Sequence, residues 1–255
     1  MFLFFGIFAI PMKILIDNDG KKIYVNEGKN DLQTYAGIIT RKDITKTKPG
    51  FKIKSHLGKE FIVIEGDFVD KIKGIKRGPQ IITLKDAGII SSYTGIGPGS
   101  KILEAGSGSG MLTCYLANLV RPNGKVLSYE IRKDFIELTK KNINSLGLNR
   151  FVQLKNADVS SSKEKNVNVV ILDLPEPWGL LNVAERALKP GGRLVCYLPT
   201  ANQVIRLLSA LDKKFIDTKV IEIIERRWQE RPESFRPGNS EMGHTAFLIF
   251  ARKIV

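Results

Sequence analysis

The fold of this chain is decided by residues 101–110, which read KILEAGSGSG. They predict a short apolar strand that carries an acidic residue, Glu104, near its end and leads into a glycine-rich turn that opens a helix. Glycine at the alternate positions Gly106, Gly108 and Gly110 lets the backbone turn tightly and approach a ligand closely. This arrangement is typical of α/β domains that bind an adenosine-containing cofactor. The glycines alone are compatible with NAD and with S-adenosylmethionine.

Around this stretch, strands alternate with helices. We expect strands at residues 101–105, 125–130, 151–154, 168–173, 192–198, 218–225 and 245–252. We expect helices at residues 85–95, 110–120, 133–147, 179–188 and 201–212, and a sharp turn after a helix at Pro190-Gly191-Gly192. The alternation predicts a Rossmann-like α/β fold with a mostly parallel, seven-stranded sheet that is covered on both faces. The last two strands have no helix between them, which predicts an antiparallel pair at one edge.

The preceding part of the chain has a different pattern. Residues 12–75 predict a small β-rich N-terminal domain, and residues 76–255 the α/β domain. In the small domain we expect two hairpins, one around the turn sequence DNDG and one around LGK, with strands at residues 14–16, 22–25, 51–55 and 61–64.

Residues 1–11 are nearly all apolar. The run is too short to span a bilayer and lacks the positively charged start of a secretion signal, so we expect no membrane attachment. Met12 begins a good first strand. We interpret Met12 as the initiator and residues 1–11 as the product of a misassigned start codon. The alternative is a short hydrophobic tail that packs on a partner.

The composition indicates an intracellular protein that binds nucleic acid. The formal net charge is +14. A charge this high favours a polyanionic partner, most simply nucleic acid, over the alternative that it reflects a basic proteome or solubility. Two cysteines make neither a disulfide framework nor a metal site, and two histidines leave little room for a histidine metal site. We therefore expect a cytoplasmic protein without a metal.

The position of Glu104 favours S-adenosylmethionine. NAD-binding turns usually read Gly-x-Gly-x-x-Gly, and here the third glycine comes one position early. A carboxylate is repelled by a pyrophosphate, whereas S-adenosylmethionine has no phosphate and carries an ammonium and a sulfonium. The N–H groups at the start of the following helix could hold the cofactor carboxylate. They belong to Ser109, Gly110, Met111 and Leu112.

Three more acids stand at successive strand ends. Glu130 could accept hydrogen bonds from both ribose hydroxyls, and Asp158 one from the adenine amino group. Asp173, followed by a rigid loop with two prolines, is the expected catalytic position. Glu130 or Asp158 alone would be read as a solvated strand end or a helix cap, whereas for Asp173 a functional site is favoured over a capped loop. In series they favour a cofactor site, because ligands of open α/β sheets lie at the carboxyl ends of the strands.

Several motifs appear in a characteristic order. They are SHLGKEF at residues 55–61, KRGPQI at 76–81, YEIR at 129–132, DLP at 173–175, RP at 236–237 and GHTAFL at 243–248. With the glycine turn, their order and spacing resemble the archaeal and bacterial tRNA (adenine-N1)-methyltransferases, whose eukaryotic relatives methylate adenine 58 of tRNA. The resemblance covers nearly the whole chain after Met12.

The resemblance implies methylation of T-loop adenine 58, or of adenines 57 and 58, by a homotetramer that binds tRNA across subunits. It implies a cofactor site that includes Gln80, the turn, Glu130, Asp158 and Asp173, and it places Tyr197 in the active site. In one respect the chain departs from the family. Thr83 stands where relatives carry an aromatic residue or a histidine before Pro-Lys-Asp, so Tyr197 could supply the face on which the adenine stacks.

Phosphate contacts are expected from basic side chains. The candidates are Lys52, Lys54, Lys59, Lys71, Lys73, Lys76 and Arg77, with His56, Arg236 and His244 as RNA or structural residues. Two other functions remain open. One is a methyltransferase acting on another RNA, a small molecule or a protein. The other is a catalytically silent tRNA-binding subunit, against which the intact glycine turn and Asp173 argue.

Overall fold

The structure is a computed structural model that describes residues 13–25, 28–76, 78, 81–229, 231–238 and 243–254. The chain divides into two compact units, residues 1–75 (the N-terminal unit) and residues 76–255 (the C-terminal unit). The predictions for residues 1–11 and Met12 lie outside the described residues.

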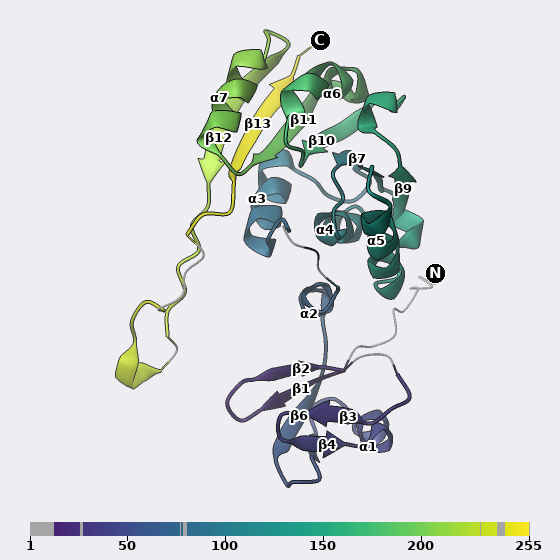
Figure 1. The fold of residues 1–255 in the computed structure, drawn as a ribbon, viewed down its shortest axis with the longest axis vertical. Helices are drawn as coiled ribbons and strands as arrows, with labels where there is room; N and C mark the ends of the chain where they lie inside the picture. Colours follow the sequence, from purple (N-terminus) through teal and green to yellow (C-terminus); the bar gives the residue numbers. More distant parts are fainter. Residues whose placement is uncertain are drawn as a thin grey trace, which may run out of the picture. The chain divides into compact units, whose positions relative to one another are not determined.

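The N-terminal unit contains a four-stranded antiparallel sheet in the order β2-β1-β6-β5 (Figure 1). Its strands are β1 (Lys13–Asp17), β2 (Lys22–Tyr24), β5 (Lys52–Lys54) and β6 (Glu60–Glu65). Both predicted hairpins are therefore present. In the first turn, Asp17 Oδ1 accepts hydrogen bonds from the N–H groups of Asp19 and Lys21, both at 2.9 Å.

Four short elements of this unit are not predicted by the sequence pattern. They are β3 (Leu32–Thr34), β4 (Gly37–Ile39), α1 (Arg41–Lys46) and α2 (Phe68–Lys73). None is longer than six residues, which is too short for an apolar repeat to show. Tertiary contacts stabilise them instead: Lys13 Nζ, for example, donates to three carbonyl oxygens at the end of α1, those of Ile44, Thr45 and Thr47.

The C-terminal unit is built on a seven-stranded sheet in the order β12-β13-β11-β10-β7-β8-β9 (Figure 1). The strands are β7 (Lys101–Ala105), β8 (Lys125–Glu130), β9 (Val152–Asn156), β10 (Val167–Leu172), β11 (Leu188–Leu198), β12 (Phe215–Glu222) and β13 (Phe247–Lys253). Six of them run in the same direction, and β13 runs antiparallel to both of its neighbours, β11 and β12. The predicted Rossmann-like sheet and its antiparallel edge are confirmed.

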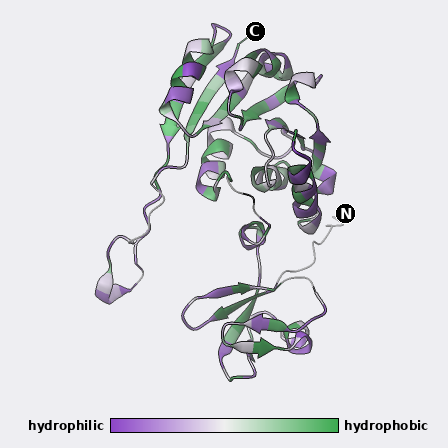
Figure 2. Ribbon diagram, viewed as in Figure 1, coloured by the Kyte–Doolittle hydropathy of each residue, from purple (hydrophilic) through white to green (hydrophobic). Residues whose placement is uncertain are grey.

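Helices cover both faces of this sheet. One group comprises α3 (Leu84–Thr94), α4 (Met111–Leu119) and α5 (Lys133–Ser145), and the other comprises α6 (Leu181–Ala187) and α7 (Ala201–Ala210). Single 3-10 turns are η1 (Asn149–Phe151), η2 (Val159–Ser161), η3 (Pro177–Leu180) and η4 (Pro232–Ser234). Figure 2 shows apolar residues along the strands of the sheet and mostly polar ones on α5. In the described part of the chain, no helix combines the length and apolarity that a membrane crossing requires.

One local prediction is wrong. Pro190-Gly191-Gly192 does not form a turn ahead of the strand but lies inside β11. Leu188 pairs with Val167, and the next pairing joins Arg193 to Val169, so four residues of β11 bulge out opposite one of β10. Proline has no N–H for the ladder, and Gly191 has a positive φ of 75°, which together explain the interruption.

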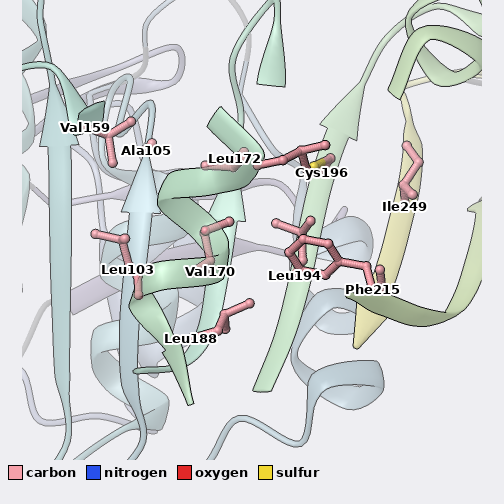
Figure 3. Close-up of a cluster of buried hydrophobic side chains, with 14 of the residues drawn as sticks. Leu103, Ala105, Val159, Val170, Leu172, Leu188, Leu194, Cys196, Phe215 and Ile249 are labelled. Carbon is pink, nitrogen blue, oxygen red and sulfur yellow. The ribbon is translucent and has the colours of Figure 1, made fainter. Parts of the chain in front are cut away.

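Side chains alternate between the two faces of the sheet, and this alternation separates the core from the polar groups. Leu103 and Ala105 on β7, Leu172 on β10, and Leu194 and Cys196 on β11 are buried on the face that α6 and α7 cover (Figure 3). The residues between them point to the opposite face, toward α3 and α4. Glu104, Glu130 and Asp173 lie on that second face.

A long segment, residues 223–246, joins β12 to β13; its described parts, residues 223–229, 231–238 and 243–246, run away from the sheet and back to it (Figure 1). We call it the arm. Two antiparallel hydrogen bonds hold its sides together, from Gln229 N to Arg236 O and from Gly238 N to Arg227 O, both at 2.8 Å. The rings of Trp228 and Phe235 stack across it with centroids 5.1 Å apart.

Candidate cofactor and active site

The glycine turn fits against the neighbouring strand ends. Gly106 N donates to Tyr129 O at 2.9 Å, and Asp173 N donates to Ala105 O at 2.9 Å. Gly106 has a φ of +89°, and a β-carbon there would lie 2.1 Å from the main-chain oxygen of Asp173. Only glycine allows the turn to approach the Asp173 loop this closely.

Two side chains of α5 hold the turn from behind. Thr139 Oγ1 donates to Gly108 O at 2.8 Å, and Asn142 Nδ2 donates to Ser109 O and to Lys76 O, each at 2.8 Å. Both side chains are buried. Sequence reasoning missed them, because a polar residue within a helix gives no sign of a partner more than thirty positions away.

A small cavity opens between the turn, the start of α4 and Asp173. It is lined by Ile81, Ile82, Gly106, Ser107, Gly108, Ser109, Met111, Leu112 and Asp173. Among the described residues, three buried side-chain oxygens have no hydrogen-bond partner: Glu104 Oε1, Ser107 Oγ and Ser109 Oγ. Burying an unpaired polar atom costs about 1–3 kcal/mol. The first turn of α4 also carries no side-chain cap. The unpaired oxygens and the uncapped N-terminus of α4 fit a ligand that supplies polar atoms to the former and an anionic group to the latter.

The carboxylates that converge here do so because of strand register. Glu104 on β7 pairs with Ser128 on β8, and Asp173 directly follows Leu172, which pairs with Cys196 on β11. Parallel neighbours in register share a face. Glu104, Glu130, Asp173 and Tyr197 therefore all lie on the face that α3 and α4 cover.

Glu104 lies beneath the turn and is only 1% exposed. Its Oε2 accepts hydrogen bonds from Thr113 Oγ1 at 2.6 Å and from Ser128 Oγ at 2.5 Å. Burial nevertheless outweighs these bonds, and with the nearby charge of Glu130 it raises the pKa of Glu104 to about 7. A cation beside this group would favour its ionised form.

Asp173 is partly exposed at the cavity. Loss of water around the carboxylate, reinforced by the negative charges of Glu104 and Glu130, raises the pKa of Asp173 to about 7. Carboxylates whose pKa is shifted toward neutrality by burial and by neighbouring charges are enriched at functional sites, which makes Asp173 a candidate.

Glu130 and Asp158 are each already engaged with main-chain N–H groups. Glu130 Oε2 accepts from Gly108 N at 3.0 Å, and Oε1 accepts from Arg132 N at 2.9 Å. Asp158 is exposed and caps η2, with Oδ1 2.7 Å from Ser160 N, and this hydrogen bond lowers the pKa of Asp158. The helix-cap reading of Asp158 is thus correct, and its ionised carboxylate keeps further acceptor capacity. The exposed Ile131, at the end of β8 beside Glu130, is a residue that the sequence reasoning assigned no role.

Tyr197 lies on β11 and is 9% exposed. Its hydroxyl donates to Asp86 Oδ2 at 3.1 Å, and burial together with the charge of Asp86 raises the pKa of Tyr197, so the phenol stays protonated. Thr83 precedes α3 and donates from Oγ1 to the same carboxylate oxygen at 3.0 Å. Thr83 therefore has a polar role in place of a stacking one.

The remaining candidates fall into separate groups. Gln80 and Arg77 lie outside the described residues. His244 is paired at both ring nitrogens, with Glu222 Oε1 at 2.5 Å and Pro199 O at 2.8 Å, which fits the expected structural role. In the N-terminal unit, His56 Nδ1 accepts from Ile38 N at 2.7 Å. Within the described ranges, no cluster of three or more His, Cys, Asp or Glu side chains could hold a metal ion.

Three lysines proposed for phosphate contacts already pair with acids of the N-terminal unit. Lys52 and Lys54 both reach Glu60, at 2.8 and 3.2 Å, and Lys59 lies 3.2 Å from Asp19. These are exposed ion pairs of small net strength, so an incoming phosphate could exchange with them.

The strand order, the glycine turn after the first parallel strand and the acids at the next strand ends define a Rossmann-like methyltransferase. A crystal structure described as an S-adenosylmethionine-dependent O-methyltransferase, from Thermotoga maritima, superimposes with a TM-score of 0.90 at 33% identity, covering 96% of this chain and 93% of that one. The structure of the tRNA (m1A58) methyltransferase TrmI from Aquifex aeolicus has a TM-score of 0.84 at 28% identity, covering 96% and 97%.

The family follows from the sequence. The model of the tRNA methyltransferase complex GCD14 subunit family matches residues 74–237. The chain belongs to this family, which confirms the resemblance of its motifs. It is 35% identical to the tRNA (adenine(57)-N(1)/adenine(58)-N(1))-methyltransferase TrmI of Methanocaldococcus jannaschii over 94% of each chain. It is 33% identical to the tRNA (adenine(58)-N(1))-methyltransferase TrmI of Thermus thermophilus over 86% of this chain and 87% of that protein.

Proposed function

We propose that this protein transfers a methyl group from S-adenosylmethionine to N1 of adenine 58 in the T-loop of tRNA. The observation that carries the proposal is Asp173, a carboxylate with a raised pKa that borders the glycine turn in a chain of this family. Adenine 58 is the target common to the names of the Methanocaldococcus and Thermus relatives, and the former also names adenine 57.

The residues of the turn suit this cofactor. Ser107, Ser109 and the start of α4 would hold its methionine carboxylate, and Glu104 would balance its positive charge. Glu130 would bind the ribose hydroxyls. Asp158 would accept from the adenine amino group, while Ile131 would pack against the adenine ring. When bound, the cofactor supplies an electrophilic methyl group.

The chemical step requires orientation more than base catalysis. Adenine N1 already carries an in-plane lone pair, so no proton has to be removed to create the nucleophile. The site must hold N1 in line for displacement, which is a gain of proximity and orientation. Attack places positive charge on the adenine. Ionised Asp173, accepting a hydrogen bond from the exocyclic amine, would stabilise that charge as it develops.

Moving the target adenine out of the folded tRNA and into the site costs free energy. Extruding a stacked base costs a few kcal/mol, which phosphate contacts from a basic protein can offset. The net charge of +14 is consistent with such contacts. Because phosphate contacts release counterions, binding of tRNA should weaken steeply as salt rises. A tRNA substrate also makes the cytoplasm the expected compartment.

We further propose a homotetramer, in keeping with the resemblance. Two exposed apolar surfaces support self-association. The stacked pair on the arm leaves Trp228 47% and Phe235 68% exposed. The edge strand β12 exposes Ile216 and Val220. Native mass spectrometry should show four chains, and a Trp228→Ala/Phe235→Ala variant should favour smaller species. A monomeric wild-type protein would contradict this assembly.

The activity can be tested with unmodified tRNA and methyl-labelled cofactor, followed by nucleoside mass spectrometry and fragment mapping. We expect N1-methyladenosine at position 58, and at position 57 as well in a tRNA that carries adenine there if the chain resembles its Methanocaldococcus relative in this respect. Asp173→Ala should reduce turnover far more than cofactor affinity. Asp212→Ala, an exposed acid in the loop before β12, is the matched control and should keep full activity.

The same assay separates the alternatives. A methylated ribose in place of N1-methyladenosine, or no methylation of the tRNA at all, as expected of a methyltransferase that acts on a small molecule or a protein, would contradict the proposal. Tight tRNA binding without transfer would indicate a catalytically silent subunit. Unchanged turnover in Asp173→Ala would remove this residue from the mechanism.

A further inference from the structure

Asp86, in the first turn of α3, is a fully buried carboxylate outside the cofactor turn. Three side chains contact its two carboxylate oxygens. Oδ2 accepts hydrogen bonds from Tyr197 Oη at 3.1 Å and from Thr83 Oγ1 at 3.0 Å. Oδ1 lies 2.8 Å from Lys85 Nζ. A buried carboxylate with several charge-assisted partners has one well-defined orientation.

The ammonium group of Lys85 also has a partner for each of its hydrogen-bond donors. Its side chain is 10% exposed, and its ammonium group has three donors. One reaches Asp86, the second reaches Ile223 O at 2.8 Å, and the third reaches Thr245 Oγ1 at 2.6 Å. Ile223 and Thr245 are the two roots of the arm, just after β12 and just before β13. Lys85 therefore ties α3 to both ends of the arm.

Tyr197, which donates its hydroxyl hydrogen bond to Asp86, lies beside Asp173. The two residues follow the registered pair Leu172 and Cys196 on adjacent parallel strands, and the charge of Asp173 opposes ionisation of the Tyr197 phenol. A tyrosine ring has two rotatable bonds. Burial of the ring, the hydrogen bond from its hydroxyl to Asp86 and a second hydrogen bond with Thr245 fix where its face points.

We propose that Asp86 and Lys85 are positioning residues that orient Tyr197 beside Asp173. Lys85 neutralises and anchors Asp86, Thr83 adds a second hydrogen bond to the same oxygen, and Asp86 holds the tyrosine hydroxyl. Because Lys85 is itself fixed by Ile223 and Thr245, the orientation of Tyr197 depends on both arm roots. The role of this unit in adenine placement rests on the proposed methyl transfer to tRNA, whereas the orientation of Tyr197 does not.

The orientation can be tested without substrate or cofactor. The full chain is labelled with tyrosine carrying carbon-13 at Cζ, and Tyr197→Phe identifies the Tyr197 resonance. Asp86→Asn keeps the shape of the side chain but removes its charge, and Lys85→Met removes the anchor. In both variants we expect the Tyr197 signal to move more than any other tyrosine signal.

A matched control lies on the same helix. Ser91 Oγ is 3.4 Å from Tyr115 Oη, so Ser91→Ala should affect Tyr115 and leave Tyr197 in place. If Asp86→Asn does not fold, Thr83→Val offers a milder test because it removes one hydroxyl from the same carboxylate. The proposal is overturned if the Tyr197 signal moves no more in the folded Asp86 or Thr83 variant than in Ser91→Ala.

Turnover provides the second readout. Asp86→Asn should lower kcat for tRNA methylation at least tenfold with little change in cofactor affinity. In a Tyr197→Phe background the same change should have almost no effect, because the two residues act as one unit. An equal loss in both backgrounds would show that Asp86 does not act through Tyr197. If wild type makes no N1-methyladenosine, the proposed function fails, while the resonance test still decides the orientation.

Discussion

The main-chain oxygen of Asp173 occupies the space that a side chain on residue 106 would need, 2.1 Å from the β-carbon position of Gly106. The glycine turn and the loop that begins at Asp173 are therefore packed backbone to backbone. Any shift of one is passed directly to the other, because neither contact atom belongs to a side chain that can rotate away.

Gly106→Ala should destabilise the protein by at least about 2 kcal/mol, since it combines a left-handed backbone with a clash against main-chain atoms. Gly108→Ala is the matched control. Gly108 also has a positive φ, +51°, but a β-carbon there meets no atom within 4 Å. We expect it to cost about 1 kcal/mol, from backbone strain alone. Denaturant unfolding of both variants measures the difference, and equal losses would contradict the close packing of Gly106.

The pKa of Asp173, raised to about 7, predicts a pH dependence for the reaction. Below that pH the carboxyl is neutral and cannot stabilise positive charge on the adenine. The value of kcat/KM, which reports on the free enzyme, should therefore rise as pH increases through about 7 and then level off. Asp173→Asn should lower the plateau by on the order of 10²-fold and reduce the rise to the part that Glu104 contributes through cofactor binding. A flat wild-type profile between pH 6 and 8 would contradict this role.

Sequence patterns could predict the fold because its main determinants are local. The apolar strands, the glycine turn at residues 106–110 and the acids at successive strand ends all lie within short windows of the chain. The topology of a parallel sheet then brings those strand ends to one edge. The sequence alone therefore predicts that Glu130 and Asp173 lie near each other.

The supporting contacts could not be predicted, because they join distant parts of the chain. Asn142 meets the turn 33 residues away, and Tyr197 meets Asp86 111 residues away. No local pattern encodes such pairs. The burial of Glu104 was also missed: strand alternation directs its side chain beneath the turn, where Thr113 and Ser128 donate to Oε2 and Oε1 keeps no partner.

Glu104 should couple cofactor binding to proton release. Its pKa is about 7 in the free protein, so near neutral pH a large fraction is protonated. A cationic cofactor would favour the ionised form, and binding should therefore release protons and tighten as pH rises from 6 to 8. Calorimetry in buffers of different ionisation enthalpy measures the protons released. Glu104→Gln should reduce that number, and an unchanged number would exclude Glu104 as their source.

The same group has a predictable effect on the stability of the free protein. An acid whose pKa is raised on folding binds more protons in the folded state. Its contribution is therefore most favourable below the unfolded value of about 4.5 and declines as pH rises to about 7. Glu104→Gln should flatten the loss of unfolding free energy across that window. Asp173→Asn serves as the comparison, because Asp173 titrates in the same range and should account for a separate part of the slope.

His244 should make the order of the arm roots depend on pH. The Glu222 carboxylate, followed by the carbonyl oxygen of Pro199, raises the pKa of His244 above its ordinary value of 6.5. The protonated ring can donate to both partners at once, which joins the ends of β11 and β12 to the start of β13. Its stabilisation is fully present below about pH 6.5 and is lost as pH rises through the folded pKa.

Hydrogen exchange of the amides flanking His244 should therefore quicken above that pH by more than the intrinsic rate increase. Glu222→Gln should bring the titration of the His244 ring, followed by NMR, back toward 6.5 and make the extra exchange begin at lower pH. Glu225→Gln is the matched control, because its carboxylate pairs with Arg227 on the arm and not with the histidine. If His244 titrates at or below 6.5 in the wild-type protein, or if both variants shift it equally, the pairing with Glu222 does not stabilise the arm roots.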